Sequence, residues 1–389
     1  MYKVECRFGN KFARLAATLA VLLTLGLSVG FSKMSNGSNF FLYVGTYGEG
    51  VFGYHFNSHD GSLKPLGLLA KIANPSFLAV DHGHRHLYAV SELNGGVNGG
   101  VAAFAIDGSS GSLRPLNSKS SDGQAPCYIS VDKTGKMVFV ANYGTGEAVA
   151  FPIDAAGKLG DTPQIISAQG SSVNPERQRG PHAHEAVPSA DNRFLYVPDL
   201  GLDQIRIYKL NAAAQKLSTN DPPLAKLPPG NGPRHIALTP DGKFAYVANE
   251  LKSVVTVFSR NSSTGALNQT QEVSTLPEGF TGDSAPAEVL MHGGGKFVYV
   301  SNRGPGTIAV FARTPGTGAL KQVQVAATGG TWPRGVAIDP TGRFLFAGDQ
   351  KSNKFVLFEI DHASGTLKLT GESFDISSPV SFVFVPAIQ

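Results

Sequence analysis

The chain has 389 residues, and its 46 glycines and 24 prolines leave little room for long helices, so the composition favours many short strands joined by turns. Apolar residues make up 42% of the chain and charged residues 16%, which excludes a disordered protein and a membrane protein with many spans. Beyond residue 30 the chain carries 29 basic and 28 acidic residues, so we expect no nucleic-acid partner.

The first 30 residues have the pattern of an export signal. A basic stretch ends at Arg14, a mostly apolar run follows, and Ser28 and Gly30 are small residues placed for cleavage after Gly30. We predict a signal peptide over 1–30, a flexible linker over 31–39, and a periplasmic or secreted protein with no stable membrane insertion after cleavage. An N-terminal membrane anchor is the alternative, because the run is only slightly shorter than the roughly 20 residues of a spanning helix.

Two cysteines occur in the chain, and the predicted cleavage separates them. Cys6 would leave with the signal peptide, and Cys127 would remain without a partner for an internal disulfide. We therefore expect the exported protein to be stable through its core alone, although its compartment would permit disulfides.

A unit of about 50 residues repeats along the rest of the chain. Each copy opens with a proline before alternating apolar residues, and each of the first six continues with a tight turn and a run with a polar tip. These prolines are Pro75, Pro126, Pro181, Pro233, Pro286, Pro333 and Pro379. A Gly-x-Leu marker recurs at Gly61, Gly111, Gly157, Gly265, Gly318 and Gly365, and Gln215 fills the seventh place. Seven copies predict an all-β, seven-bladed β-propeller with four antiparallel strands per blade.

The two ends of the repeat region predict how the ring closes. Residues 40–44 have the pattern of a second strand, and residues 379–385 have the pattern of a first strand. Pairing them in one blade would complete the seventh sheet and hide an edge that would otherwise favour aggregation. We expect one propeller domain over residues 40–389, and the sequence gives no indication of its oligomeric state.

Four short motifs stand where first strands begin and second strands end. They are Gly-Pro-His-Ala-His at 180–184, Gly-Pro-Arg-His at 232–235, Tyr-Val-Ala-Asn-Glu at 246–250 and Ser-Asn-Arg-Gly at 301–304. With them the chain resembles, from about residue 40 to 385, the seven-bladed lactonase family of bacterial 6-phosphogluconolactonases and the fungal carboxy-cis,cis-muconate cyclase. The resemblance implies a lactonase of carbohydrate metabolism with no required metal, and we expect no cofactor.

Polar residues at these strand ends should meet at one mouth of the propeller, because the two positions lie at the same end of an antiparallel blade. The candidate catalytic residues are His182, His184, Arg234 and Glu250, and the candidate substrate-binding residues are His235, Asn249, Glu288, Arg303 and Arg334. Three arginines at one mouth predict an anionic ligand, because guanidinium groups match carboxylates and phosphates. The resemblance implies that this partner is a small anionic lactone. Charges on the first turn of each blade, such as Arg85 and Lys136, are expected at the opposite face in solvent.

His184 is the most unusual candidate, because the other six copies carry an apolar residue at its position. A buried imidazole must be hydrogen-bonded, so a satisfied core histidine is the alternative to a functional one. We expect His182 or His184 to activate water as a general base and Arg234 to stabilise the oxyanion. Glu250 would orient Arg234 or carry a proton.

Three other functions stay open. The cyclase relatives imply the same residue types, so a muconate-type cycloisomerase is not separated from a hydrolase. The pair His182 and His184 could serve as metal ligands, which would make the protein a metal-dependent lactonase. A non-catalytic exported binding propeller is the third. Export also conflicts with a phosphorylated substrate made in the cytoplasm. Either the substrate is an unphosphorylated or carboxylated lactone outside the cytoplasm, or the leader is not a signal.

Overall fold

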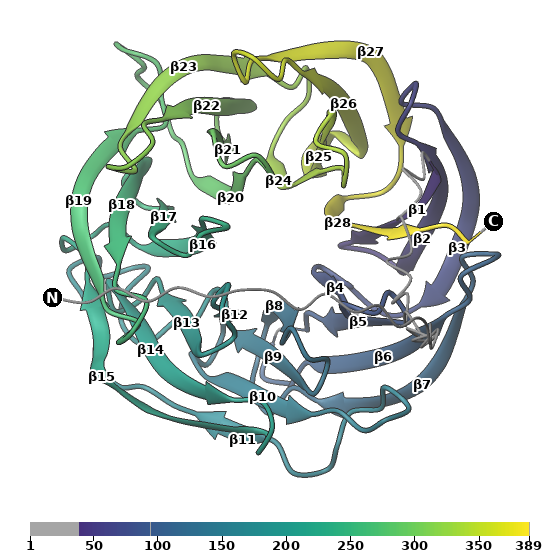
Figure 1. Cartoon of the computed structure of the whole chain (residues 1–389), viewed down its shortest axis with the longest axis horizontal. Helices are drawn as coiled ribbons and strands as arrows, with labels where there is room; N and C mark the ends of the chain where they lie inside the picture. Colours follow the sequence, from purple (N-terminus) through teal and green to yellow (C-terminus); the bar gives the residue numbers. More distant parts are fainter. Residues whose placement is uncertain (1–38, 94, 389) are drawn as a thin grey trace, which may run out of the picture. The chain divides into compact units, whose positions relative to one another are not determined.

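The computed structural model of the chain describes residues 39–93 and 95–388, which form seven four-stranded antiparallel sheets arranged radially (Figure 1). This confirms the predicted seven-bladed propeller. In these residues the one helix is the short 3-10 segment η1 (Gln350–Ser352), and no helix is long and apolar enough to cross a membrane. The predicted signal peptide and the linker up to residue 38 lie outside the described residues.

The strands of six blades follow the chain from the inner to the outer edge of each sheet. The first three of these are β4 (Leu78–Val80), β5 (His86–Ser91), β6 (Gly100–Ile106) and β7 (Leu113–Ser120); β8 (Pro126–Val131), β9 (Met137–Asn142), β10 (Ala148–Pro152) and β11 (Gln164–Ile166); β12 (Val187–Pro188), β13 (Phe194–Asp199), β14 (Gln204–Asn211) and β15 (Lys216–Lys226). The next three are β16 (Pro233–Leu238), β17 (Phe244–Asn249), β18 (Val254–Arg260) and β19 (Leu267–Ser274); β20 (Pro286–Met291), β21 (Phe297–Asn302), β22 (Thr307–Arg313) and β23 (Leu320–Ala327); β24 (Pro333–Ile338), β25 (Phe344–Asp349), β26 (Lys354–Ile360) and β27 (Leu367–Asp375).

The seventh blade contains both ends of the described chain. Its sheet has the order β28 (Pro379–Pro386), β1 (Asn39–Thr46), β2 (Gly50–Asn57) and β3 (Leu63–Lys71). The register runs antiparallel from Phe40 opposite Pro386 to Thr46 opposite Pro379. The predicted closure of the ring is confirmed, and β1 has no free edge toward the axis.

The Gly-x-Leu marker joins neighbouring blades. A tyrosine in the second strand of one blade donates its hydroxyl to the carbonyl of the marker glycine in the next blade, as Tyr246 does to Gly318 at 2.9 Å. The other four pairs are Tyr43 with Gly111, Tyr88 with Gly157, Tyr196 with Gly265 and Tyr299 with Gly365. Gly318 has φ of 73°, and an added Cβ would lie 2.3 Å from the Phe244 ring, so glycine is required there.

The blade that carries the two candidate histidines departs from the repeat. Its inner strand β12 begins at Val187, and the six residues from Pro181 form only an isolated bridge between Ala183 and Asp199. The expectation that a strand starts at Pro181 is therefore wrong. The Asp199 carboxylate accepts the His182 N–H at 2.8 Å, beside the two backbone hydrogen bonds of this bridge.

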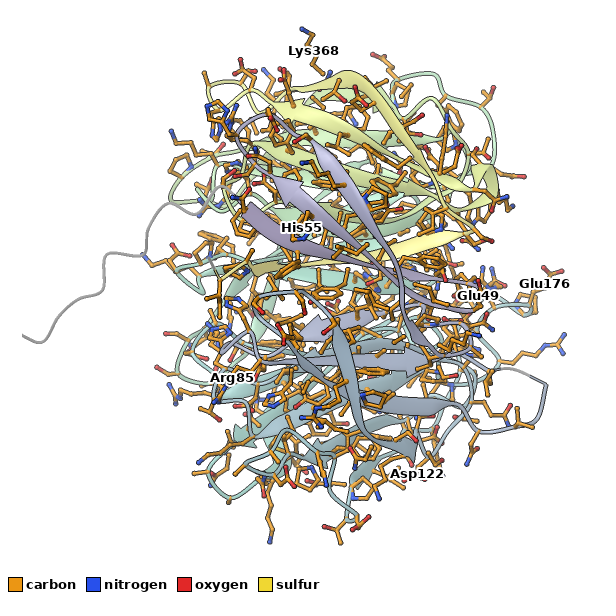
Figure 2. All side chains as sticks on the ribbon, turned by 90° about the vertical axis from the view of Figure 1, so that its right-hand side faces the viewer. Glu49, His55, Arg85, Asp122, Glu176 and Lys368 are labelled. Atoms are coloured by element: carbon orange, nitrogen blue, oxygen red, sulfur yellow. The ribbon has the colours of Figure 1, made fainter. Side chains whose placement is uncertain are left out.

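The two faces of the ring differ in the turns that they carry. Seen edge-on, Glu49 and Glu176 lie on one face, and Arg85 lies on the opposite face (Figure 2). We call these the Glu176 face and the Arg85 face. The strand ends with the candidate residues belong to the Glu176 face, because Glu49 lies in the turn after β1 and Glu176 lies in the connection before β12.

Candidate active site

A β-bulge after the blade proline sets the direction of several candidate side chains. The pairing of β16 with β17 shifts between Pro233 and His235, which leaves Arg234 as the bulged residue. The same shift brackets Arg334 in β24 and Cys127 in β8. Since a bulge leaves its residue unpaired and turns its side chain, the repeat itself provides the slot that these residues occupy.

Glu250 is the centre of a cluster of arginines. It follows β17 directly, and its carboxylate lies 2.6 Å from Arg303 Nη2, 2.7 Å from Arg177 Nη2 and 3.2 Å from Arg234 Nε. Burial raises the pKa of Glu250, but the charges of Arg303, Arg234 and Arg177 outweigh it and lower the pKa to about 2. The carboxylate is therefore ionised at all physiological pH values. We call Arg177, Arg234, Arg303 and Arg334 the arginine cluster.

Arg234 is almost fully buried, with 2% of its surface exposed. Its Nη1 donates to the Ala287 carbonyl at 2.6 Å and lies 3.3 Å from His235 Nε2. Its Nε forms the ion pair with Glu250 without hydrogen-bond geometry, so this buried N–H has no hydrogen-bond partner among the described residues. A buried, oriented donor of this kind is suited to a negative charge that develops during a reaction.

His235 and Glu288 support Arg234 from behind. His235 Nδ1 lies 2.8 Å from Glu288 Oε1, and burial lowers the pKa of His235 to about 4. The imidazole is therefore neutral, so it donates from Nδ1 to the Glu288 carboxylate and accepts from Arg234 at Nε2. The structure thus brings both residues to the site, but their polar atoms are engaged with each other and with Arg234.

Tyr143 connects the two candidate histidines with the arginine cluster. Its ring stacks on His182 with centroids 4.6 Å apart, and it meets the His184 ring edge-on at 5.3 Å. Its hydroxyl accepts from Arg177 Nη2 at 3.0 Å. The three elements that carry these residues are thereby joined at the Glu176 face.

The two histidines have different surroundings. His182 is half-buried, and its Nδ1 lies 2.7 Å from the Tyr143 carbonyl, so Nδ1 carries a hydrogen and Nε2 is the acceptor atom of the neutral ring. His184 is 3% exposed, and its Nδ1 lies 3.5 Å from Cys127 Sγ. Burial, followed by the charge of Arg234, lowers the pKa of His184 well below its usual value.

Arg303 and Arg334 belong to neighbouring blades, since Arg303 follows β21 and Arg334 lies in β24. Arg303 donates from Nε to the Ala285 carbonyl at 2.9 Å, and its guanidinium lies 5.5 Å from the centre of the Trp332 ring. Arg334 lies over the Tyr47 ring at 5.2 Å, and its Nη2 is 4.0 Å from Glu92. Both charges are thus held by cation–π contacts as well as by carboxylates.

Asn249 does not belong to the cluster. It is fully buried and donates to Thr256 Oγ1 within its own blade at 2.8 Å. Its counterpart Asn302 is likewise engaged away from the cluster, since it donates to the carbonyl of Thr275, which follows β19 of the preceding blade, at 2.9 Å. The polar strand tip is therefore a structural feature of the repeat.

Sequence reasoning missed Arg177. It lies in the connection between β11 and β12, outside the repeat, so no comparison between copies could single it out. The available signal was the spacing from Pro126 to Pro181, which is the longest interval between the blade prolines.

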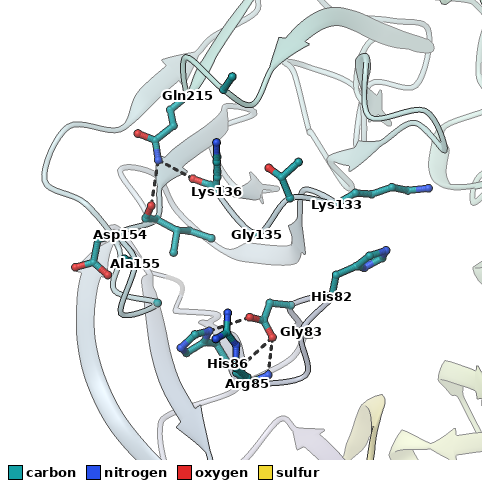
Figure 3. Close-up of a pocket in the computed structure, with 15 residues that line it drawn as sticks. His82, Gly83, Arg85, His86, Lys133, Gly135, Lys136, Asp154, Ala155 and Gln215 are labelled. Atoms are coloured by element: carbon teal, nitrogen blue, oxygen red, sulfur yellow. Dashed lines mark hydrogen bonds and ion pairs between the residues drawn. The ribbon is translucent and has the colours of Figure 1, made fainter. Parts of the chain in front are cut away.

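The Arg85 face has cavities of its own. One, of about 550 Å³, is lined by residues that include His82, Arg85, His86 and Lys133 (Figure 3). The Asp81 carboxylate accepts from the backbone of Arg85 and His86, so the polar groups of this turn satisfy one another. A second cavity, of about 470 Å³, extends from this face to Tyr128 and Glu288, behind the arginine cluster. In the part of the chain that the structure describes, no group of three or more His, Cys, Asp or Glu side chains is arranged to hold a metal ion.

Comparisons with known proteins agree on one family. The family described as Lactonase, 7-bladed beta-propeller matches residues 41–384. The 6-phosphogluconolactonase of Bacillus subtilis is 36% identical over 347 residues, which cover 88% of this chain and 97% of that protein. The 6-phosphogluconolactonase of Formosa agariphila is 33% identical over 336 residues, or 84% of this chain and 94% of that protein. The solved structure of a periplasmic gluconolactonase from Pseudomonas aeruginosa has a TM-score of 0.85 and 35% identity, and the match covers 90% of this chain and 100% of that one.

Proposed function

Because the chain belongs to the seven-bladed β-propeller lactonase family, as its motifs predicted, we propose that it hydrolyses a small, acidic, sugar-type lactone in the manner of a 6-phosphogluconolactonase. The observation that carries this proposal is the buried Glu250 carboxylate among three arginines, joined through Tyr143 to a histidine with a free Nε2. The names of two relatives and one structural neighbour, all lactonases, support the reaction class.

His182 is the proposed general base. Its Nδ1 donates to the Tyr143 carbonyl, so Nε2 can take a proton from the attacking water. His184 is less suited to this role, because it is almost fully buried and its Nδ1 faces the Cys127 thiol. We therefore propose His182 rather than His184 from the two alternatives that the sequence left open.

Arg234 is the proposed oxyanion partner. Water attacks the lactone carbonyl carbon as His182 removes its proton, and the carbonyl oxygen becomes an oxyanion that Arg234 stabilises. When this intermediate collapses, the bond to the ring oxygen breaks, and protonated His182 returns the proton to the leaving oxygen. The product is a hydroxy acid, and no covalent enzyme intermediate is required. Glu250 holds Arg234 and Arg303 in place, while His235 and Glu288 orient Arg234.

Export and three alternative functions complete the proposal. We propose that the protein is exported through the leader over 1–30, which is supported by the periplasmic gluconolactonase that the fold matches. The same side chains would suit the cycloisomerase alternative, in which proton transfer leads to ring closure. The metal-dependent lactonase and the binding propeller remain alternatives that one assay can separate.

A panel of lactones tests the proposal on the chain from residue 35, which retains all described residues. We expect hydrolysis of sugar lactones, followed as acid release, with the same rate before and after chelation. Loss of activity on chelation with recovery on adding a divalent ion would establish the metal-dependent alternative. A folded protein that binds lactones without turnover would establish the binding propeller, and ring closure of a muconate without hydrolysis would establish the cycloisomerase.

A further inference from the structure

We propose that Arg177 is a specificity-determining residue that binds the distal anionic group of the lactone, an inference that rests on the proposed function. The shared chemistry is a phosphate or carboxylate group at the end of the substrate away from the reacting carbonyl. Arg177 would exchange its contact with Glu250 for this group when the substrate enters.

Arg177 belongs to the longest connection between an outer strand and the next inner strand. The segment from β11 to β12 spans 20 residues, 167–186, whereas the other six connections of this type span 3 to 11 residues. A long loop in an otherwise regular ring is where recognition residues are commonly found. This loop lies on the Glu176 face, together with the arginine cluster.

The loop is fixed in place by buried polar side chains. Gln178 is fully buried and donates to the Leu200 carbonyl at 2.8 Å. Asp203 accepts from Ser172 Oγ at 2.5 Å and from the backbone of Gly230 at 2.7 Å. Asn174 Oδ1 accepts from the Arg177 backbone N–H at 3.0 Å. These contacts position the base of Arg177 before any ligand binds, which lowers the entropic cost of recognition.

Arg177 is the accessible member of the cluster. Its side chain is 41% exposed, whereas those of Arg234 and Arg303 are 2% and 7% exposed. Nη2 makes both of its contacts, with Glu250 and Tyr143, and among the described residues Nε and Nη1 have no hydrogen-bond partner. The guanidinium therefore has free donors for a bidentate contact with an anion.

Release of Arg177 from Glu250 would leave no buried charge unpaired. Glu250 would keep Arg303 at 2.6 Å and Arg234 at 3.2 Å. Arg303 and Arg234, in contrast, are also bound to the carbonyls of Ala285 and Ala287, so their displacement would cost those hydrogen bonds. Of the three arginines that contact Glu250, Arg177 can therefore turn to a ligand at the smallest cost.

The charges at the site favour an added anion. The four guanidinium groups lie among the carboxyl groups of three residues, Glu92, Glu250 and Glu288, so the basic groups outnumber these acidic ones. Burial, and after it the charge of Glu288, raises the pKa of Glu185 well above its usual value, which favours its neutral form. A substrate with one or two negative charges would balance this surplus.

The test compares three lactones in the Arg177→Gln variant and in a control variant, Arg179→Gln, which changes an exposed arginine on the same loop. The substrates are 6-phosphogluconolactone, a glucarolactone with a free carboxylate, and neutral gluconolactone. We expect Arg177→Gln to raise the KM for at least one acidic lactone by a factor about ten times larger, or more, than the factor by which it changes the KM for neutral gluconolactone. If the KM for 6-phosphogluconolactone rises, Arg177 recognises phosphate, and if the KM for the glucarolactone rises, it recognises carboxylate.

Equal losses on all three lactones would overturn the proposal and make Arg177 a positioning residue for Glu250. No change on any lactone, or an equal effect in Arg179→Gln, would overturn it as well. If the wild-type protein hydrolysed no lactone, the proposed function would fail separately. Calorimetric binding of 6-phosphogluconate, glucarate and gluconate would then decide, since Arg177→Gln must still weaken one of the first two more than gluconate.

Discussion

The two faces of the propeller both carry recurring charged residues, but they use them differently. On the Arg85 face, each of six blades has one basic residue after its first turn, and two of these bridge to the next blade: Arg193 to the Ser262 carbonyl at 3.3 Å and Arg343 to the Ser58 carbonyl at 3.0 Å. These two are therefore not simply solvated, as the sequence had suggested. On the Glu176 face, charge is concentrated in a few blades around Glu250.

This difference helps to distinguish residues that stabilise the fold from residues that serve the active site. A feature that recurs in most blades meets a need that those blades share, such as a joint to the neighbouring blade or the end of a strand. A feature confined to one blade, such as His182 or the loop with Arg177, has no such explanation. One blade lacks the tyrosine that joins it to the next blade, because Phe139 stands at that position. There Gln215, which replaces the marker glycine, donates from Nε2 to the carbonyls of Lys136 and Ile153 and makes the connection instead (Figure 3).

The largest effect should come from breaking the ring itself. Deleting residues 379–389 removes β28, exposes the edge of β1 and opens the ring. We expect loss of the cooperative unfolding transition and aggregation, measured by circular dichroism and size-exclusion chromatography. A chain that ends at Ala387 keeps β28 and serves as the control. A soluble, cooperatively folded deletion would contradict the role of β28 in closure.

The next largest effect should come from replacing the two histidines of the blade that departs from the repeat. His182→Ala should lower kcat by about two or more powers of ten, the size expected for loss of a general base. His184→Ala, the matched control, removes a buried ring beside Cys127. Compared with His182→Ala, it should lower the melting temperature more and kcat less. Steady-state rates and melting temperatures of both variants provide the comparison. If His184→Ala loses more turnover than His182→Ala, the two roles are reversed.

The sequence predicted the features that recur and missed those that depend on the path of one loop. Seven prolines and seven markers were enough to predict seven blades and their closure, because each copy repeats the same local pattern. Arg234 and Arg303 were placed correctly at one mouth for the same reason. Arg177 lies 73 residues from Glu250 in the chain, and its contact depends on buried anchors such as Gln178 that have no periodic signature.

Asn249 and the inner strand of the histidine blade show the opposite error. The repeat predicted that a polar strand tip faces the mouth, but the Asn249 amide bonds within its blade. It also predicted a strand from Pro181, but only an isolated bridge forms there, and the Asp199 carboxylate bonds to the His182 N–H. Side-chain hydrogen bonds that compete with the sheet cannot be seen from apolar periodicity alone.

The smallest effect should come from replacing Asp349, at the end of β25, with the asparagine that other blades carry at the end of their second strand. Asn142 and Asn302 donate their amides to the carbonyls of Ser121 and Thr275 at 2.9 Å. At the equivalent tip, Asp349 instead accepts from Thr328 Oγ1 at 2.7 Å, and its Oδ2 is buried without a hydrogen-bond partner in the described chain. We therefore expect Asp349→Asn to stabilise the fold, since its amide could donate to the Thr328 carbonyl.

The pH dependence makes this prediction sharper. Burial raises the pKa of Asp349 to about 6, whereas the unfolded value is 3.8. Above pH 6 the folded wild-type protein must hold a buried, poorly satisfied carboxylate, so Asp349→Asn should raise the free energy of unfolding by about 1 kcal/mol. Between pH 6 and 3.8 the folded state binds the proton first, so the advantage of the variant should shrink as the pH falls.

Asp199→Asn is the matched control: it would leave Arg206, 3.3 Å from Asp199, without its buried partner, and should destabilise the fold. Denaturant titrations at several pH values measure both variants, and an advantage of Asp349→Asn that persists unchanged at acid pH would contradict the assigned cause.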